Sequence, residues 1–419
     1  MSSDNAPSTV SAGDRHIDWE QVFASRMGRM KASEIRELLK LLEQPDIISF
    51  AGGIPDPALF PKEAFAEAYA EVLGGEGAGA ALQYSVSEGY KPLRKWVAGE
   101  MAGIGVECTE DNILIVSGSQ QALDYLGKLL LSPGDTALVN WPTYMGALGA
   151  FNAYEPNYDR LKAGVNRSAD DYRETAEAHG GRVKFAYLSV DFANPTGETL
   201  DLRERESILD LAAELDIAII EDAAYQRLRY DGEAVLPILA LEIERTGSID
   251  SCRTLYCGSF SKTLAPGLRL GWICGARDVI SKLVLMKQAA DLHSSTINQI
   301  AIAKVAEKHF EEQVAKLRKT YSERRNAMVA ALERHMPENV RFTRPEGGMF
   351  VWITLPDHLD GADLLAQSLK TEKVAFVPGR AFFADGSNGN TMRLSFSCAG
   401  EAVIEEGISR LGRLLKTVC

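Results

Sequence analysis

The feature that most constrains the fold is a regular alternation of strand-like and helix-like segments between residues 113 and 275. Longer segments with apolar residues at helical spacing, such as 120–131 and 203–215, separate several short runs rich in Val, Ile, Leu and aromatic residues. Strands that alternate with helices form mostly parallel sheets with helices on both faces. We therefore expect an α/β domain, with strands over 113–117, 136–140, 184–190, 217–222, 254–258 and 271–275.

The C-terminal part of the chain has a different pattern. Strand-like runs over 347–355, 374–379 and 391–397 lie next to helix-like segments over 361–372 and 400–416. This mixture is typical of a smaller α+β unit. A long helical stretch over 278–335 is expected to bridge the two units.

These patterns predict how the chain divides into domains. Residues 1–16 are polar and are expected to form a disordered tail. The predicted N-terminal segment over 17–60 belongs to the small domain, and it includes a helix over 33–43 with an apolar stripe. The large ligand-binding domain is expected over 61–305 and the C-terminal small domain over 306–419.

The charge of the chain argues against nucleic-acid partners. The sequence has 58 acidic and 45 basic residues, a net charge of −13 at pH 7, and acidic proteins repel phosphate backbones. The N-terminus lacks the apolar segment of a signal peptide, and no apolar run approaches the roughly 18 residues of a membrane helix. We expect a cytoplasmic protein without a membrane partner. The cysteines and histidines have no metal-binding spacing, so no metal site is expected.

Polar residues follow five of the predicted strands at the point where each strand ends. Ligands of open α/β sheets bind outside the carboxyl ends of the strands. We therefore expect these residues to meet at one site. They are GSQQ after 113–117, WPTY with Tyr144 after 136–140, DFANPTG with Asn194 after 184–190, Asp222 at the end of 217–222, and SFSK with Lys262 after 254–258.

Part of this set is suited to a phosphate group. Ser119 and Gln120 begin a predicted helix, where free N–H groups and the helix dipole favour an anion. Ser259, Ser261 and Arg269 add hydroxyl and guanidinium donors. Taken alone, a serine at such a start is more commonly an ordinary helix cap.

The rest of the set is suited to an aldehyde and an aromatic ring. Lys262 in a cationic, desolvated place is expected to have a lowered pKa and to attack a carbonyl carbon. Asp222 can protonate a ring nitrogen, Tyr225 can hydrogen-bond a ring oxygen, and Tyr144 can stack on the ring. A phosphate, an aldehyde and a pyridine nitrogen together describe pyridoxal 5'-phosphate (PLP). Each residue alone has a structural alternative, a surface lysine or a core-edge tyrosine among them.

Several motifs resemble a known family over about residues 20–416. SGSQQAL, NPTG, EDAAY, GSFSKTLAPGLRLG and MRLSFS resemble, in this order, the motifs of class I and II aminotransferases of PLP fold type I. KASEIRELLKL, ISFAGGIPDPALFP, ALQYSVSEGYKPLRKWV, ADLH and RPEGGMFVWITLP resemble the subgroup of 2-aminoadipate (LysN-type) and kynurenine aminotransferases. The resemblance implies a mostly parallel seven-stranded sheet between helices, with a smaller α+β domain. It also implies a homodimer that moves an amino group from an L-amino acid to 2-oxoglutarate by a ping-pong mechanism.

The resemblance also implies a role for each matching residue. For the substrate, Arg393 would bind the α-carboxylate, Gly53 and Asn194 would lie against it, and Arg36 would pair with a side-chain carboxylate. For the cofactor, Lys262 would carry the Schiff base and move the proton, and Asp222 would pair with the ring nitrogen. Asn194 and Tyr225 would hydrogen-bond the ring oxygen, and Tyr144 would stack on the ring. The phosphate would be held by Ser119, Gln120, Ser259, Ser261 and Arg269, together with Tyr84 from the other subunit.

Three other functions are compatible with parts of the sequence. Ser259 and Lys262 form the S-x-x-K pattern of serine β-lactamases, but Pro266 and Gly267 interrupt the helix that this motif needs, and no SDN or KTG triplet occurs. A PLP-binding domain of a transcription regulator is a second alternative, although only about 20 residues precede the resemblance. Another fold type I activity, such as β-elimination or decarboxylation, is the third. Two departures from the subgroup, Ala223 after Asp222 and SVDFANPTG for PSFQNPTG, leave the substrate open.

Overall fold

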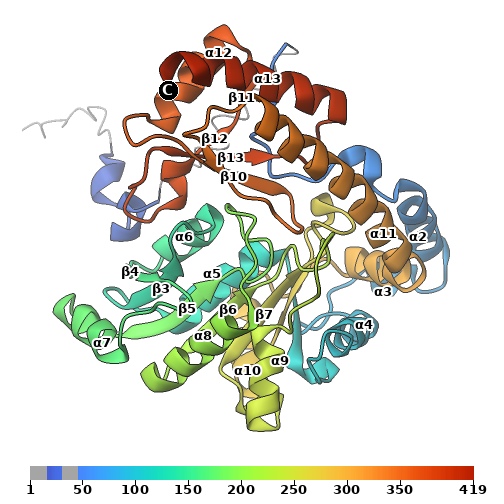
Figure 1. Ribbon diagram of the computed structural model, residues 1–419. Helices are drawn as coiled ribbons and strands as arrows, with labels where there is room; N and C mark the ends of the chain where they lie inside the picture. The colour runs from blue at the N-terminus through green and yellow to red at the C-terminus, as the bar shows by residue number, and fades with distance from the viewer. Residues whose placement is uncertain (1–16, 31–45) are drawn as a thin grey trace, which may run out of the picture.

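The computed structural model describes residues 17–30 and 46–419 of the protein (Figure 1). The predicted tail over 1–16, the predicted helix over 33–43 and Arg36 lie outside the described residues. Within the described part of the chain, no helix is long and apolar enough to cross a membrane.

A seven-stranded sheet forms the centre of the larger part of the molecule (Figure 1). Its strand order is β2-β8-β7-β6-β5-β3-β4, and every neighbouring pair is parallel except those that involve β8. This sheet confirms the predicted α/β class. The strands are β2 (Ile113–Val116), β3 (Thr136–Asn140), β4 (Asn157–Leu161), β5 (Val183–Leu188), β6 (Ala218–Asp222), β7 (Thr254–Ser259) and β8 (Gly271–Cys274).

Helices cover both faces of this sheet because its strands are apolar on both sides. On β5, Phe185 and Tyr187 pack toward one layer of helices, while Ala186 and Leu188 pack toward the other. The first layer contains α5 (Ser119–Leu130), α6 (Met145–Asn152) and α10 (Arg277–Ala290). The second contains α7 (Ala169–Ala178), α8 (Leu202–Leu215) and α9 (Ile238–Thr246).

A smaller antiparallel sheet with the order β12-β13-β10-β9 lies above the large one in Figure 1. A separate pair of short parallel strands, β1 and β11, joins the N-terminal segment to this part of the molecule. Its elements are β1 (Ile48–Ser49), β9 (Arg341–Phe342), β10 (Phe350–Thr354), β11 (Val374–Ala375), β12 (Val377–Pro378), β13 (Thr391–Ser395), α12 (Gly361–Thr371) and α13 (Glu401–Val418).

The predicted helical stretch over 278–335 is two helices, α10 and α11 (Thr296–His335), which are separated at residues 291–295. The N-terminal half of α11 packs in the core beside the large sheet, and its C-terminal half packs in the core of the smaller sheet. The helices α2 (Lys62–Gly74), α3 (Ala78–Leu82) and α4 (Lys91–Ala102) lie along it. The domain boundaries near residues 60 and 305 stay predictions, and the second falls inside α11.

Candidate active site

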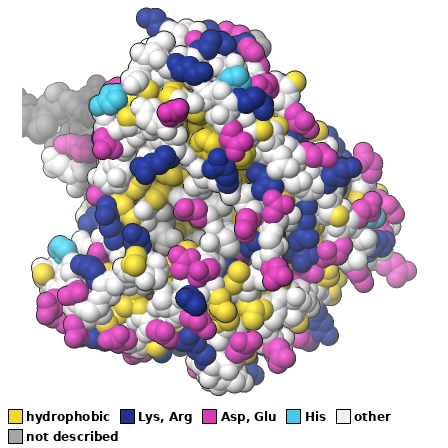
Figure 2. All heavy atoms as spheres, viewed as in Figure 1, with side chains coloured by type: hydrophobic (Ala, Val, Ile, Leu, Met, Phe, Trp, Pro, Cys, Tyr) yellow, Lys and Arg dark blue, Asp and Glu magenta, His cyan; other side chains and the backbone are white. Residues whose placement is uncertain are grey.

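A cavity of about 980 Å³ lies at the carboxyl edge of the large sheet, beside the loop over 343–346 of the smaller unit. Its lining includes the polar side chains of Tyr144, Tyr187 and Asn194 and exposed charged side chains of both signs, such as Lys162 and Glu198. Figure 2 shows acidic and basic side chains mixed over this side of the molecule. The cavity therefore has a polar interior suited to a small charged ligand.

Lys262 lies three residues beyond β7, within a turn that ends at Arg269. Its Nζ donates a hydrogen bond to the carbonyl oxygen of Gly53 at 3.0 Å and lies 5.7 Å from the centroid of the Tyr225 ring. Burial lowers the pKa of Lys262 to about 8, with help from the positive charges of Arg393 and Arg269 and against the opposing effect of Asp222. Such an amine is neutral far more often than an ordinary lysine, so it can act as a nucleophile or a base.

Asp222 ends β6 and is buried, with one carboxylate oxygen held and the other free. Its Oδ2 accepts a hydrogen bond from the hydroxyl of Tyr187 at 2.8 Å, while Oδ1 has no partner among the described residues. Burial raises the pKa of Asp222, and hydrogen bonds from Tyr187 and the Ala224 N–H oppose that rise. A buried, unpaired carboxylate oxygen is costly unless a ligand donor pairs with it.

Glu221 shows why only the second of the two adjacent acids lies on the side of Tyr187 and Lys262. Successive side chains of a strand point to opposite faces, and Glu221 accepts hydrogen bonds from the N–H groups of Ile238 at 2.9 Å and Leu239 at 3.1 Å. These are free donors at the start of α9, so Glu221 is a buried helix cap. Burial raises its pKa to about 7.

The loop between β2 and α5 has the geometry of an anion site. Gly118 precedes the first helical residue, Ser119, with φ of +87°. A Cβ at this glycine would come within 2.3 Å of the Arg269 guanidinium, so the close approach of loop and arginine requires glycine. The exposed Arg269 thus lies beside the free N–H groups at the helix start. Ser259 ends β7, just before the turn that contains Arg269, and its Oγ accepts a hydrogen bond from the Ser261 N–H at 3.1 Å.

Arg393, on β13 of the smaller sheet, is buried beside Asn194 and the segment that carries Gly53. Its Nη1 donates to Asn194 Oδ1 at 2.7 Å and its Nη2 donates to the Ala51 carbonyl at 2.9 Å. The guanidinium lies 4.2 Å from the Phe350 ring centroid, and its Nε has no partner in the described part of the chain. Since a guanidinium has five N–H donors, donors remain for a ligand carboxylate.

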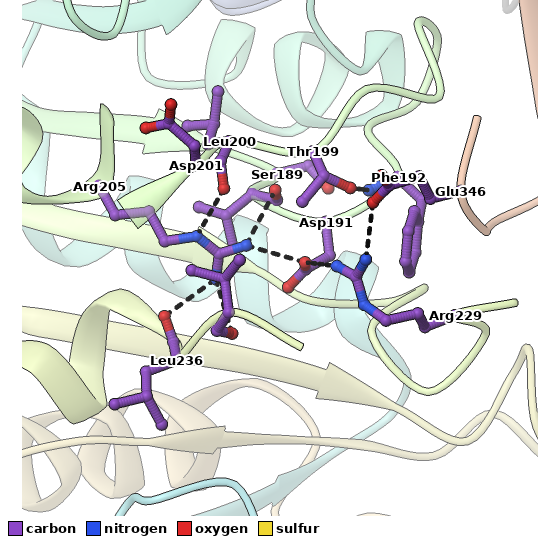
Figure 3. A network of polar contacts seen from close by, with 12 residues as sticks. Ser189, Asp191, Phe192, Thr199, Leu200, Asp201, Arg205, Arg229, Leu236 and Glu346 are labelled. Atoms are coloured by element: carbon purple, nitrogen blue, oxygen red, sulfur yellow. Dashed lines mark hydrogen bonds and ion pairs between the residues drawn. The ribbon is translucent and has the colours of Figure 1, made fainter. Parts of the chain in front are cut away.

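Asn194 is held in place by a charged network beneath its loop (Figure 3). Asp191 accepts from Arg205 at 2.8 Å and from Arg229 at 3.1 Å, and Arg229 also donates to Glu346 at 2.9 Å. Arg205 is fully buried and donates to the carbonyls of both Leu200 and Leu236 at 3.0 Å. The loop that follows β5 is therefore fixed at both ends, which fixes Asn194.

Of the remaining predicted residues, Tyr144 and Gln120 are held near the others, whereas Tyr84 is exposed. Tyr144, at the N-terminus of α6, is near enough to Asp222, Arg393 and Arg269 for these charges to affect its pKa, which burial raises. Gln120 donates to the Gly146 carbonyl at 2.7 Å. Tyr84, in contrast, is 78% exposed, and its ring contacts His293 at a centroid distance of 6.0 Å.

Tyr187 is the site residue that the sequence did not predict. It lies within the buried run from Phe185 to Leu188 of β5, and its only distinguishing signal is a hydroxyl in a run that is otherwise apolar. Within residues 17–30 and 46–419, no group of three His, Cys, Asp or Glu side chains is arranged for a metal ion. The unpaired Asp222 oxygen, the free Arg393 donors, the lowered pKa of Lys262 and the anion-binding loop together fit a phosphorylated pyridine aldehyde.

Comparisons with known proteins identify the family of the chain. The sequence profile of the family described as Aminotransferase class I and II matches residues 46–411. The chain is 44% identical to the 2-aminoadipate transaminase of Thermus thermophilus over 96% of this chain and 98% of that protein. It is 42% identical to aromatic-amino-acid aminotransferase 1 of Thermococcus litoralis, over 96% of this chain and 95% of the relative. The structure is also similar to the crystal structure of LysN, an α-aminoadipate aminotransferase from Thermus thermophilus, in complex with N-(5'-phosphopyridoxyl)-L-leucine. The two structures superpose with a TM-score of 0.86 and are 40% identical in sequence, over 96% of this chain and 99% of that chain.

Proposed function

Because the chain belongs to the class I and II aminotransferase family, we propose that it transfers the amino group of an L-amino acid to 2-oxoglutarate. The proposed donors are 2-aminoadipate, aromatic amino acids and leucine-like amino acids, which the names of the relatives and the leucine adduct in the LysN structure support. The fold is that of the type I PLP enzymes, and the cofactor is pyridoxal 5'-phosphate. When bound, this cofactor supplies an aldehyde that reacts with amines and a pyridine ring that accepts electrons.

The observation that carries the proposal is that Lys262 and Asp222 are both buried and near enough for the charge of each to affect the pKa of the other. Lys262 has a lowered pKa, and Asp222 has a buried, unpaired oxygen. We assign Lys262 to the attachment of the cofactor and to the movement of the substrate α-proton. Asp222 Oδ1 is assigned to the ring nitrogen, where a carboxylate favours the protonated ring.

The other cofactor contacts follow from which donors are free. Asn194 accepts from Arg393 through Oδ1, and its side chain is hydrogen-bonded to Tyr225, so we assign the Asn194 amide and the Tyr225 hydroxyl together to the ring oxygen. Tyr144 is assigned to the ring face. The phosphate is assigned to the anion site, where Ser119, Gln120, Ser259, Ser261 and Arg269 supply the donors.

Arg393 is assigned to the substrate α-carboxylate. Its guanidinium is held by Asn194 and the Ala51 carbonyl, so its remaining N–H donors point in a fixed direction. Gly53 contributes by its small size, because a Cβ there would lie 3.4 Å from Arg393 Nη2 and 3.2 Å from the Phe350 ring. Substrate at Arg393 would thus lie beside the Lys262 amine, which donates to the same Gly53.

We also propose that the enzyme is a homodimer with shared sites. Tyr84 is exposed, and Leu82 and Val86 beside it are exposed as well. An exposed apolar segment of this kind is typical of an interface. In this proposal Tyr84 donates its hydroxyl to the phosphate bound in the partner subunit.

Product analysis tests the proposed reaction. The purified protein with PLP is incubated with single L-amino acids and 2-oxoglutarate, and glutamate and the matching 2-oxo acid are quantified. Equal amounts of both products, dependent on 2-oxoglutarate, are expected. Release of ammonia and an oxo acid without 2-oxoglutarate would instead indicate β-elimination, and release of carbon dioxide would indicate decarboxylation. Either result would overturn the proposal.

A further inference from the structure

Lys287 is a fully buried lysine that the proposed reaction does not use. It lies in the last turn of α10, with a side chain that is 0% exposed. Its Nζ lies 3.0 Å from each of four oxygens, which are Gln121 Oε1, Ser294 Oγ and both carboxylate oxygens of Asp291. An ammonium group has three donors and no acceptor, so this all-oxygen shell is suited to a charged lysine.

Asp291 extends the contacts of Lys287 to the start of α5. Its Oδ2 accepts from Gln121 Nε2 at 2.8 Å and from Ser117 Oγ at 3.2 Å, and its Oδ1 accepts from the Tyr125 hydroxyl at 3.1 Å. The Asp291 side chain is 30% exposed. Burial raises the pKa of Asp291, but the hydrogen bonds from Gln121 and Lys287 outweigh it and keep this pKa below its ordinary value. The Lys287–Asp291 ion pair is therefore hydrogen-bonded both to Ser117 in the loop before α5 and to Gln121 in α5.

The contacts to Ser117 and Gln121 lie on either side of the anion site along the chain. Ser117 precedes Gly118, and Gln121 follows Gln120, so the network contacts the residues on either side of the segment that carries Ser119 and Gln120, the two loop residues that we assign to phosphate binding. Gln121 Oε1 also accepts from the Ser117 N–H at 2.8 Å, which joins the two ends of the loop directly. The Ser117 carbonyl in turn accepts from Arg269 at 3.5 Å.

The loop from Ser117 to Gln121 fits closely against Arg269, so small movements of the loop would alter the anion site. Gly118 approaches the Arg269 guanidinium so closely that no Cβ fits between them. A shift of a few tenths of an ångström would therefore change both the direction of the N–H groups and the place of the arginine. Burying a lysine also opposes its charged form, and burial does lower the pKa of Lys287. An apolar side chain would avoid that cost, but Gln121 Oε1 and both Asp291 oxygens would each lose one donor, and Asp291 would lose its charge partner.

We propose that Lys287 and Asp291 are positioning residues that hold the loop from Ser117 to Gln121 in the shape that binds the phosphate group of the cofactor. This inference rests on the proposed assignment of the phosphate to this loop. It predicts an effect on phosphate recognition, and not a general effect on cofactor binding, because neither residue contacts the parts of the site assigned to the ring.

The test compares two ligands that differ only in the phosphate. The full chain, freed of cofactor, is titrated with pyridoxal 5'-phosphate and with pyridoxal, and the two dissociation constants are taken from tryptophan fluorescence. The variants are Lys287→Met, Asp291→Asn and Arg269→Ala. Arg325→Met is the matched control, because Arg325 is also a buried cation, it pairs with Asp231 at 2.5 Å, and its partners lie outside the phosphate loop.

Lys287→Met is expected to weaken binding of pyridoxal 5'-phosphate about tenfold, the effect of about 1.4 kcal/mol, and to change pyridoxal binding less than about twofold. Asp291→Asn is expected to act in the same direction, by about threefold, and it keeps the test available if Lys287→Met does not fold. In Arg325→Met, the ratio of the dissociation constant for pyridoxal to that for pyridoxal 5'-phosphate should equal the wild-type ratio.

Each outcome has a distinct meaning. Arg269→Ala lowers the preference for the phosphorylated ligand if the phosphate assignment is right. If Arg269→Ala has this effect but Lys287→Met and Asp291→Asn weaken both ligands equally or neither, the positioning role is wrong and the phosphate site stands. If Arg269→Ala leaves the ratio unchanged, the phosphate assignment itself is wrong, and the inference is overturned with it.

Discussion

Replacing Tyr187 by phenylalanine removes one hydroxyl group from the buried surroundings of Asp222. In the structure this hydroxyl donates to Asp222 Oδ2 at 2.8 Å, and both residues are buried. The ring of Tyr187 packs against Phe151 at a centroid distance of 5.5 Å, and phenylalanine keeps that packing. The substitution therefore changes the electrostatics of Asp222 with little change in shape.

The size of the effect follows from the loss of a hydrogen bond to a charged group, about 1.5–3 kcal/mol. If Asp222 stabilises the protonated cofactor ring, this energy is lost where charge develops on the ring, so the rate of the amine half-reaction should fall about 10- to 100-fold. The pH dependence should change too. Burial raises the pKa of Asp222 and Tyr187 opposes this, so without Tyr187 the carboxylate becomes protonated at a higher pH. The acid limb of the rate profile should then move to higher pH.

The assay is single-turnover conversion of the cofactor-loaded enzyme by an amino acid, followed by visible absorbance from pH 5 to 9. Tyr172→Phe is the matched control, because Tyr172 is an equally buried tyrosine whose hydroxyl donates to the Arg160 carbonyl at 2.7 Å, away from Asp222. It should lose stability without a change in rate or profile. A Tyr187→Phe enzyme with the wild-type rate and acid limb would refute the reasoning, as would equal losses in both variants.

Four further outcomes are expected. Lys262→Ala should lose the visible absorbance of attached cofactor and nearly all transamination, and near wild-type turnover would remove Lys262 from its assigned role. Asp222→Asn should still bind PLP, measured by fluorescence, while its rate falls by more than that of Tyr187→Phe; unchanged kinetics would make Asp222 structural. In the cofactor-free enzyme, PLP attachment should speed up as pH rises through about 8 because the neutral amine reacts, whereas a rise only near 10.5 would contradict the lowered pKa of Lys262. Sedimentation at assay concentration should show a dimer, and a fully active monomer would exclude a shared Tyr84.

The sequence was informative wherever a strand ends in a polar residue. Such a position combines an apolar run, which predicts the strand, with a residue that the run does not explain, and Asp222 after "IAII" is the clearest case. The parallel order of the strands then brings these ends to one edge. For this reason the sequence predicts that Asp222, Asn194 and Lys262 share a site. In the structure Asp222 and Lys262 are near enough for the charge of each to affect the pKa of the other, and Asn194 contacts Arg393, whose charge also acts on Lys262.

The residues that sequence reasoning missed depend on pairing between distant segments. Tyr187 reaches Asp222 only because β5 and β6 pair with Tyr187 opposite Ile220, and no local pattern contains that register. Lys287 shares the buried stripe of α10 with Ile280, Leu283 and Val284, and its partner Gln121 comes from α5, so no pattern within α10 shows what the lysine contacts. The strand β4 was missed for another reason: it lies at the edge of the sheet and carries Asp159 and Arg160 instead of an apolar run.

The charges around Lys262 imply that substrate binding and proton transfer are coupled. After burial, the largest causes of its lowered pKa are the positive charges of Arg393 and Arg269. In the proposed reaction both arginines bind anions, a substrate carboxylate at Arg393 and the cofactor phosphate at Arg269, and each anion cancels part of that positive field. The pKa of the Lys262 amine therefore rises when the site fills. The same amine is a better nucleophile before substrate occupies Arg393 and a better proton acceptor once substrate is bound, which is the order in which the proposed reaction needs the two properties.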